Sequence, residues 1–289
     1  MLTANLSHVL DGFLLGGLYA GVALGLTLVF GVMRLVNLAH GEVLIAAAYL
    51  AFVVVGYIHL DPLLSLVIVA PVMFVLAYPV QRYLLNPLVH SGLEAPLVAT
   101  FGISVIAQTV FVLVFGANPK SLEAAYTLTG INLGIEKVRT IFVIAAALGL
   151  LLVAATHFGL TRFRFGKALR AAAEDPVAAA ALGVDVDHVY ALTFALAAGL
   201  SSFGGVLIGL AFSMDPTAGL AWLLRGFTVI VLGGMGSIWG SFLGGIITGI
   251  AEEFGAAYVG PQYRDLIVFS LLVVVLVVRP GGLLGRKVT

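Results

Sequence analysis

Apolar runs close to 20 residues long recur throughout the chain, and they constrain its fold more than any other feature. A helix needs about 20 apolar residues to cross the roughly 30 Å hydrocarbon core of a bilayer. Candidate spans are residues 10–32, 38–58, 62–81, 96–116, 138–157, 189–212, 222–234, 239–258 and 264–279. The span at 222–234 is too short to cross alone, and we interpret it as a re-entrant segment or as half of a broken helix. The sequence therefore predicts an all-α, polytopic helical membrane protein with eight or nine transmembrane elements in a single domain, residues 1–289.

The composition supports this interpretation. Of the 289 residues, 61% are hydrophobic and only 10% are charged. A soluble domain usually carries about a quarter charged residues, so this chain is too poor in charge to cover a globular surface. The formal net charge is zero, which gives no reason to expect nucleic-acid binding. The chain has no cysteine, which excludes disulfides and thiolate metal sites.

The distribution of Lys and Arg predicts the orientation, because cytoplasmic loops near span ends are enriched in these residues. One alternation of the spans places nine basic residues on one side, namely Arg34, Arg82, Arg162, Arg164, Lys167, Arg170, Arg279, Arg286 and Lys287. It leaves five on the other side, namely Lys120, Lys137, Arg139, Arg225 and Arg264. We therefore expect the N-terminus outside, and the C-terminus and the loop at 158–188 in the cytoplasm. This arrangement needs an odd number of crossings and so favours nine elements.

The loop at 158–188 is the one stretch that resembles a soluble segment. The run from Lys167 to Ala173 consists of good helix formers. Pro176 disfavours helical geometry in the residue before it, and Gly183 is suited to end a second short turn. We predict a helix–break–helix unit that is too small to fold alone. It is either a basic loop held by anionic lipid or, as its small alanines favour, a helix inserted into the groove of a partner.

Three polar residues, Asn37, His40 and Glu42, stand where the second span begins. Ionisable groups at membrane depth are costly, and they usually face a cavity or a partner. We expect these residues either to have a structural role at the cytoplasmic mouth or to belong to a gate or pathway. His40 and Glu42 alone, without a His-Glu-x-x-His pattern, do not predict a metal site.

The fourth span carries Thr100, Ser104 and Gln108 at intervals of four residues, which places them on one helix face. Their polar groups either form hydrogen bonds between helices or line a polar route for a substrate. Both interpretations predict that this face does not point toward lipid.

A glycine-rich stretch containing Gly233 and Gly234 interrupts an apolar run. Glycines disfavour a continuous helix, and broken spans are typical of transporters. We expect a gate or a packing turn on the cytoplasmic side. Farther out, a pair between Arg225 and Glu252 or Glu253 would lower the cost of these charges in the membrane.

Three motifs then resemble one known family over nearly the whole chain. They are Asn37-Leu-Ala-His-Gly-Glu42, Gly166-Lys-Ala-Leu-Arg-Ala-Ala-Ala-Glu-Asp-Pro176 and Val231-Leu-Gly-Gly-Met-Gly-Ser-Ile-Trp-Gly240. Together they resemble the branched-chain amino acid permeases of ATP-binding-cassette (ABC) transporters, specifically the shorter, first-type subunit. The resemblance implies a fold like that of the vitamin-B12-type importers. It also implies that the cytoplasmic loop is a coupling helix that enters a cleft of an ATP-hydrolysing subunit. The loop residues to which this role would fall are Gly166, Lys167, Arg170, Ala171, Glu174, Asp175 and Gly183.

The resemblance further implies partners and a location. The partners would be a second, related permease, two ATP-binding subunits and an extracytoplasmic binding protein that holds most of the specificity, all at the inner membrane of a bacterial cell. The substrate would be a branched-chain or related small amino acid, with urea or short amides as the alternative. The chain lacks the Gly-x-x-x-x-Gly-Lys-[Ser/Thr] loop that cradles phosphates. We therefore expect a transporter subunit with no catalytic residues and no cofactor, driven by ATP hydrolysis on another chain.

An ion-coupled secondary transporter acting alone is the main alternative from another class. It would need buried carboxylates near the middle of the membrane to carry the coupling ion. Glu252 and Glu253 are the only adjacent pair within a span, and they lie off-centre.

Overall fold

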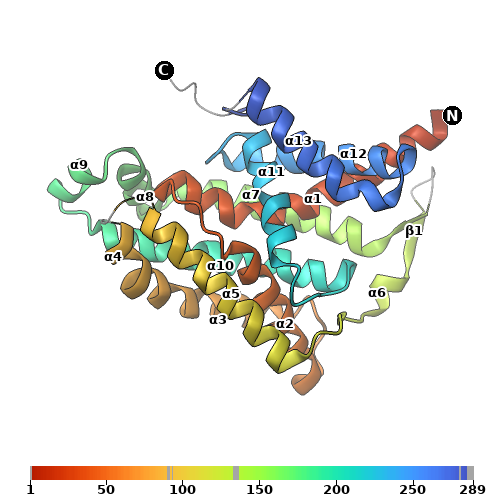
Figure 1. The fold of residues 1–289 in the computed structure, drawn as a ribbon, viewed down its shortest axis with the longest axis horizontal. Coiled ribbons are helices and arrows are strands. Elements are labelled where there is room, and N and C mark those ends of the chain that lie inside the picture. Colours follow the sequence, from red (N-terminus) through yellow and green to blue (C-terminus); the bar gives the residue numbers. More distant parts are fainter. Residues whose placement is uncertain (1, 90–91, 93, 133–136, 280, 285–289) are drawn as a thin grey trace.

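The computed structural model describes residues 2–89, 92, 94–132, 137–279 and 281–284, and it is built almost entirely of helices (Figure 1). The helical elements are α1 (Leu2–Met33), α2 (His40–Ile58), α3 (Leu66–Pro79), the π-helical turn η1 (Val80–Leu85), α4 (Asn86–Val89), α5 (Glu94–Phe115), α6 (Ala125–Leu128), α7 (Thr140–Arg162), α8 (Arg164–Glu174), α9 (Pro176–Ala181), α10 (Val186–Ala211), α11 (Gly219–Gly233), α12 (Ile238–Tyr258), the 3₁₀ turn η2 (Pro261–Tyr263) and α13 (Arg264–Val278). Two short strands, β1 (Gly130–Asn132) and β2 (Lys137–Arg139), form an antiparallel hairpin.

Seven of the described helical stretches are long and apolar enough to cross a membrane. The pair α11 and α12 adds one more if it counts as a single span, bent by 114° at its break. This total of up to eight lies within the predicted range of eight or nine elements, at its lower end. The short seventh span is indeed one arm of a broken pair, because the chain turns sharply between Gly233 and Ile238.

The two ends of the bundle differ. The α8 end carries α8 and α9, and the hairpin end carries β1 and β2 together with the N-terminal end of α1 (Figure 1). After α13 the chain returns to the α8 end, because the backbone N–H of Leu283 donates to the carbonyl oxygen of Leu232 at 2.8 Å. The beginning of α1 and the described end of the chain therefore lie at opposite ends of the bundle.

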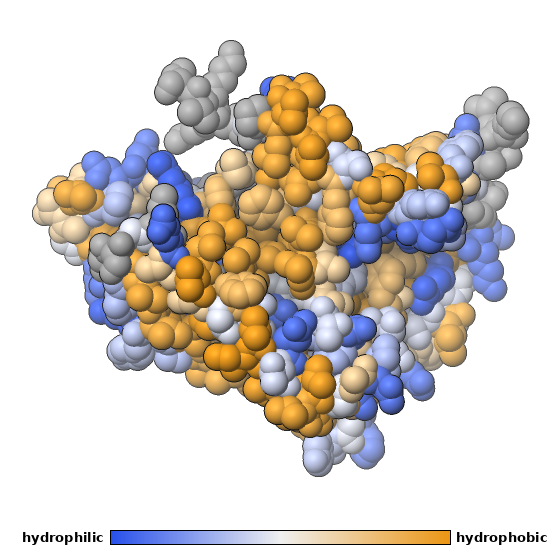
Figure 2. Space-filling view, viewed as in Figure 1, coloured by the Kyte–Doolittle hydropathy of each residue, from blue (hydrophilic) through white to orange (hydrophobic). Residues whose placement is uncertain are grey.

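Two helices, α1 and α10, form the centre of the bundle. In the most apolar stretch of α1, 89% of residues are buried, against 6% in α5 and in α13. Glycines allow α1 and α12 to approach closely, since a Cβ atom at Gly16 would lie 2.4 Å from the Cα atom of Ile246. Close backbone packing of this kind replaces the hydrophobic drive that lipid cannot supply. The apolar surface over α5 and α13 (Figure 2) is then left to face lipid or another subunit.

The third span runs farther than the sequence predicts. Its helical stretch extends from Leu66 to Val89, whereas the apolar pattern ends at residue 81. A π-helical turn carries the chain past this point, and the buried Gln81 donates to the side chain of Asn86, five residues on, at 2.8 Å. Asn86 in turn donates to the carbonyl oxygen of Asp187 at 2.9 Å. Polar side chains thus hold together a segment that hydropathy alone does not identify as helix.

Candidate functional site

The loop at 158–188 forms the helix–break–helix unit that the sequence predicts. Helix α8 ends at Glu174, Asp175 is extended, and α9 follows from Pro176 to Ala181. Helix α8 begins at Arg164, however, and so includes Gly166 and starts before the predicted run. The pair α8–α9 projects from the bundle at its far edge (Figure 1).

One face of α8 is fastened to the bundle. Leu169 and Ala172 are buried in an apolar cluster that also contains residues of α1 and α10. Gly166 lies so close to the preceding helix that a Cβ atom would approach the carbonyl oxygen of Leu160 to 2.0 Å. The guanidinium of Arg170 donates a hydrogen bond to that same oxygen. Gly166 and Arg170 therefore seat α8 on α7, a contact that the sequence did not reveal.

The turns that bound α9 are held by local hydrogen bonds. The carboxylate of Asp175 accepts from the backbone N–H groups of Val177 at 2.9 Å and Ala178 at 3.0 Å, which caps the helix. Gly183 follows the helix with φ +86°, a conformation that favours glycine. The backbone N–H of His188, aided by nearby Arg82, holds the pKa of Asp185 below its usual range. Asp185 therefore remains a charged cap at the start of α10 at neutral pH.

The opposite face of the pair is free of the bundle. Lys167, Ala171 and Glu174 are exposed on α8. Val177 on α9 and Leu182, the residue that follows α9, are 77% and 85% exposed, which is unusual for apolar side chains in a segment outside the spans. We call these five residues the α8–α9 outer face. Val177 and Leu182 were not predicted from the sequence, although an apolar residue on each side of four alanines is a usable signal.

The second group of predicted residues lies inside the bundle. After α1 ends at Met33, the chain reverses at Arg34 (φ +53°) and runs back before α2 begins at His40. The Nε2 atom of His40 lies 3.4 Å from the carbonyl oxygen of Val22, more than two helical turns before the end of α1. These residues therefore lie inside the bundle, beside α1. Their role at the cytoplasmic mouth, or in a gate or pathway, stays a prediction.

Glu42 is the buried charge of this group. It is 4% exposed, its Oε1 atom accepts from the hydroxyl of Ser104 at 3.2 Å, and its Oε2 atom has no hydrogen-bond partner among the described residues. Gly219, the first residue of α11, packs against the Glu42 carboxylate, since a Cβ atom there would lie 2.1 Å from Oε1. The described residues hold no cluster of three or more metal-ligating side chains. A buried carboxylate with one unpaired oxygen is instead a position for a polar solute or a proton.

The polar face of α5 closes this cluster. The hydroxyl of Thr100 accepts from the backbone N–H of Leu38 at 3.3 Å, and Gln108 donates to the carbonyl oxygen of Thr217 at 3.4 Å. Together with the Ser104–Glu42 bond, these contacts connect α5 to the loop before α2, to α2 itself and to the turn before α11. This face of α5 is therefore turned toward the rest of the bundle, and its position relative to lipid stays a prediction. We call Asn37, His40, Glu42, Thr100, Ser104 and Gln108 the inner polar cluster.

The glycine break lies at the α8 end and is tightly packed. A Cβ atom at Gly233 would lie 1.9 Å from the carbonyl oxygen of Gly240, and Gly234 has φ +104°. The backbone N–H of Leu284 donates to the carbonyl oxygen of Gly233 at 3.0 Å. The break therefore forms a packed turn against which Leu283 and Leu284 lie.

The predicted ion pair between Arg225 and Glu252 or Glu253 is wrong. Arg225 pairs instead with Asp265, and Glu253 pairs with Arg264 at 3.0 Å. Glu252 accepts from the hydroxyl of Tyr19 at 2.5 Å. The partners all come from α1 and α13, so sequence separation gave no hint of them.

Comparison with known proteins identifies the family. Residues 8–276 match the family described as "Branched-chain amino acid transport system / permease component". The high-affinity branched-chain amino acid transport system permease protein BraD of Pseudomonas aeruginosa is 35% identical over 297 residues, covering 97% of this chain and 96% of BraD. The permease protein LivH of Escherichia coli K12 is 32% identical over 297 residues, with the same coverages of 97% and 96%. The permease protein LivM of the same organism is 29% identical over 151 residues, covering 50% of this chain and 35% of LivM. The chain belongs to the permease components of branched-chain amino acid transport systems.

Proposed function

We propose that this chain is a transmembrane permease subunit of an ATP-driven importer for branched-chain or related small amino acids. The observation that carries the proposal is the 35% identity to BraD over 97% of the chain, because the name of BraD gives branched-chain amino acids as its transported solutes. Import of urea or short amides by the same architecture is the alternative.

The α8–α9 outer face is the proposed contact with the ATP-hydrolysing subunit. It projects beyond the bundle, and Ala171 together with the adjoining exposed Ala178 and Ala180 allows the close approach that a helix in a groove requires. Its rim carries Lys167 and Glu174, which offer charges of both signs to a partner. Gly166, Arg170 and Asp175 contribute by holding this face in place, through the contacts with Leu160 and the cap of α9.

A second permease is the proposed partner within the membrane. Escherichia coli K12 has both LivH and LivM, each named as a permease protein of a high-affinity branched-chain amino acid transport system. In this chain α5 buries only 6% of its most apolar stretch and borders the inner polar cluster. A second subunit covering α5 would enclose Ser104 and Gln108 in a route between two permeases. A binding protein would deliver the substrate at the hairpin end.

The charge distribution supports the orientation proposed from the sequence. The described basic residues of the predicted cytoplasmic set lie at the α8 end, where Arg82 pairs with Asp185 at 3.3 Å. Lys137, Arg139 and Arg264 lie together at the hairpin end. Because cytoplasmic segments are enriched in Lys and Arg, we place the α8 end in the cytoplasm and the start of α1 outside.

A stand-alone, ion-coupled transporter is less well supported. That alternative needs buried carboxylates near the middle of the membrane. The adjacent pair Glu252 and Glu253 lies off-centre in its span, and Tyr19 and Arg264 bind these two carboxylates.

The experiment is reconstitution of the chain in liposomes, alone and together with the second permease, the ATP-binding subunits and the binding protein. We expect uptake of radiolabelled L-leucine only by the full set and only with ATP, with excess urea having little effect. Accumulation of leucine by this chain alone under a proton or sodium gradient would contradict the proposal. Competition by urea as strong as that by unlabelled leucine would select the alternative substrate.

A further inference from the structure

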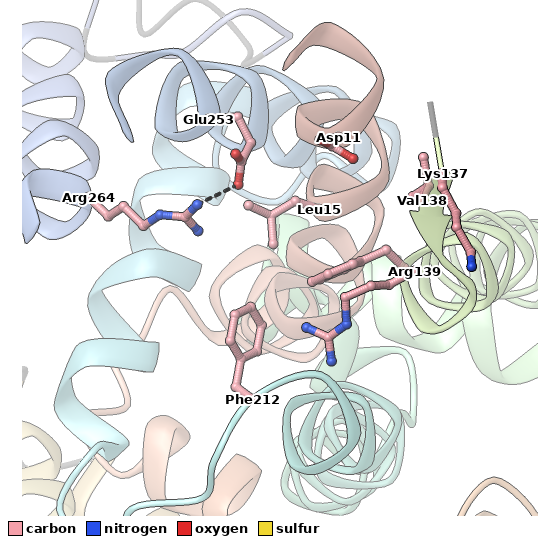
Figure 3. A pocket seen from close by; sticks show the side chains of 9 residues that line it. Asp11, Leu15, Lys137, Val138, Arg139, Phe212, Glu253 and Arg264 are labelled. Carbon is pink, nitrogen blue, oxygen red and sulfur yellow. Dashed lines mark ion pairs between the residues drawn. The ribbon is translucent and has the colours of Figure 1, made fainter. Parts of the chain in front are cut away.

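A cavity lies at the hairpin end of the bundle. It has a volume of about 300 Å³, and it lies where α1, β2, α7, α12, α13 and the residue after α10 converge (Figure 3). This volume is at the lower limit of common ligand pockets, so the cavity suits a small solute. Its lining residues are Asp11, Leu15, Lys137, Val138, Arg139, Phe142, Phe212, Glu253 and Arg264.

The charged lining has both signs. Lys137, Arg139 and Arg264 contribute positive charge, and Asp11 and Glu253 contribute negative charge. Arg264 and Glu253 are paired with each other at 3.0 Å, and Figure 3 shows them entering the cavity together. The Glu253 carboxylate can accept further hydrogen bonds beside Arg264, so the lining as a whole offers charges of both signs to a ligand.

Arg139 is held in a position from which it can bind an anion. One guanidinium nitrogen donates to the carbonyl oxygen of Ala211 at 3.4 Å, and the guanidinium lies 5.3 Å from the ring centre of Phe142. These contacts use only part of its donor capacity, because a guanidinium carries five N–H donors. Arg139 also immediately precedes α7, a helix of 23 residues whose N-terminal end adds positive potential. A carboxylate is the anion that a guanidinium binds with two parallel hydrogen bonds.

The rest of the lining is apolar. Leu15, Val138, Phe142 and Phe212 come from four separate segments of the chain. Figure 3 shows Phe212 beside the guanidinium of Arg139, with Leu15 between Arg139 and the Arg264–Glu253 pair. An aliphatic side chain placed here would contact carbon atoms on several sides, while its polar groups would lie within reach of the charged residues.

We propose that this cavity is a binding site for a zwitterionic, aliphatic α-amino acid on the side where the binding protein releases its substrate. Arg139, supported by Lys137, binds the α-carboxylate. Asp11 and Glu253 supply the negative charge that the α-ammonium requires, and the apolar lining accepts the side chain. The inference rests on the proposed function and narrows its substrate class, because neutral urea or an amide gains little from a site with charges of both signs.

The experiment measures binding of tritiated L-leucine to the purified assembly in nanodiscs, without ATP and without the binding protein. We expect saturable binding that unlabelled leucine displaces and that 3-methylbutylamine or 4-methylpentanoate displaces poorly, because each of these lacks one of the two charged groups. Arg139→Gln should weaken leucine binding about tenfold or more, as expected for a lost hydrogen bond between charged groups. Arg139→Lys should restore part of the affinity.

Lys120→Gln is the matched control, since Lys120 is a cation at the same end whose ammonium stacks on Phe52, outside the cavity lining. It should bind leucine like the unmodified chain, and all variants should keep their melting temperature. Absence of saturable binding, equal losses in Lys120→Gln and Arg139→Gln, or equal displacement by the amine or the acid would each overturn the inference. If ATP-driven leucine uptake proceeds normally in Arg139→Gln, the inference fails while the proposed function stands. If the unmodified assembly takes up no leucine, the proposed function itself fails.

Discussion

At the scale of single residues, the Gln108 side chain already has a hydrogen-bond partner within the protein and can still bind a polar solute. Its amide donates to the carbonyl oxygen of Thr217 at 3.4 Å, which is long for such a bond, and the side chain is only half-buried. A weak contact at an open edge is readily exchanged for a passing polar solute. A tighter, fully enclosed bond would indicate a purely structural tie.

We therefore expect Gln108→Leu to slow ATP-driven uptake in the reconstituted assembly while assembly and coupled ATP hydrolysis stay near normal. Loss of the hydrogen bond should lower the free energy of unfolding by only about 0.6 kcal/mol, the average for such bonds in membrane proteins. Uptake and thermal unfolding are measured on the same preparation. Thr109→Val is the control, because the hydroxyl of Thr109 bonds the carbonyl oxygen of Val105 within its own helix at 2.8 Å. Unchanged uptake with a lowered melting temperature would remove Gln108 from the route.

At the scale of elements, one face of α8 packs against the bundle and the opposite face is exposed. Leu169 is 4% exposed and belongs to the apolar cluster with α1 and α10, whereas Ala171 is exposed on the outer face. From the sequence alone, the basic residues of this loop cannot be distinguished from one another. Arg170, however, is committed to the carbonyl oxygen of Leu160. Its substitution would unseat the helix, so an effect on coupling would not report on the partner.

Ala171→Glu is the sharper change. An exposed substitution usually alters stability by no more than about 0.5 kcal/mol, so we expect normal insertion and melting. A carboxylate at the centre of the outer face should nevertheless lower ATP-driven leucine uptake by about tenfold, the effect of losing about 1.4 kcal/mol of contact energy. Ala117→Glu, at an exposed position after α5, is the matched control and should transport normally. Leu169→Ala should instead lower stability by about 2–5 kcal/mol. Full uptake by Ala171→Glu would rule out the outer face as the coupling contact.

At the scale of the whole molecule, the distribution of basic residues and the positions of the two described chain ends support the same orientation. The start of α1 lies at the hairpin end and the described end of the chain at the α8 end, as the predicted odd number of crossings requires. The total of up to eight spans does not contradict this, because α11 and α12 reverse the chain direction at their 114° bend. Helix α12 packs along α1 at Gly12 and Gly16, and the break before α12 contacts Gly31 through Gly236.

The absence of cysteine makes the orientation directly measurable. Single cysteines replace Glu123, in the loop after α5, and Lys167 on α8, both of which are exposed. With a membrane-impermeant maleimide on intact spheroplasts, we expect Glu123→Cys to be labelled at once and Lys167→Cys only after permeabilisation. The unmodified chain serves as the unlabelled control. The reverse labelling pattern would invert the proposed orientation and place the α8–α9 outer face away from cytoplasmic ATP.

The sequence by itself determined the features that depend on local chemistry. Hydropathy placed the long spans, and Pro176 and Gly183 placed the break and the end of the α8–α9 unit. The four-residue spacing in α5 predicted a polar face, which the structure turns toward the bundle. Each of these follows from the conformational preference or the solvation of neighbouring residues, which a sequence states directly. The three motifs indicated the family because a motif is read directly from the order of its residues.

Only the tertiary structure decided where the polar groups meet. The depth of Asn37–Glu42 depends on the reversal at Arg34, and the partners of Arg225 and Glu252 depend on how α1 and α13 pack beside α11 and α12. The cavity around Arg139 draws its lining from residues between Asp11 and Arg264, more than 250 positions apart. Contacts between helices are set by the rotation and depth of whole elements in the bundle, and a helical pattern gives the face of a side chain without giving its neighbour.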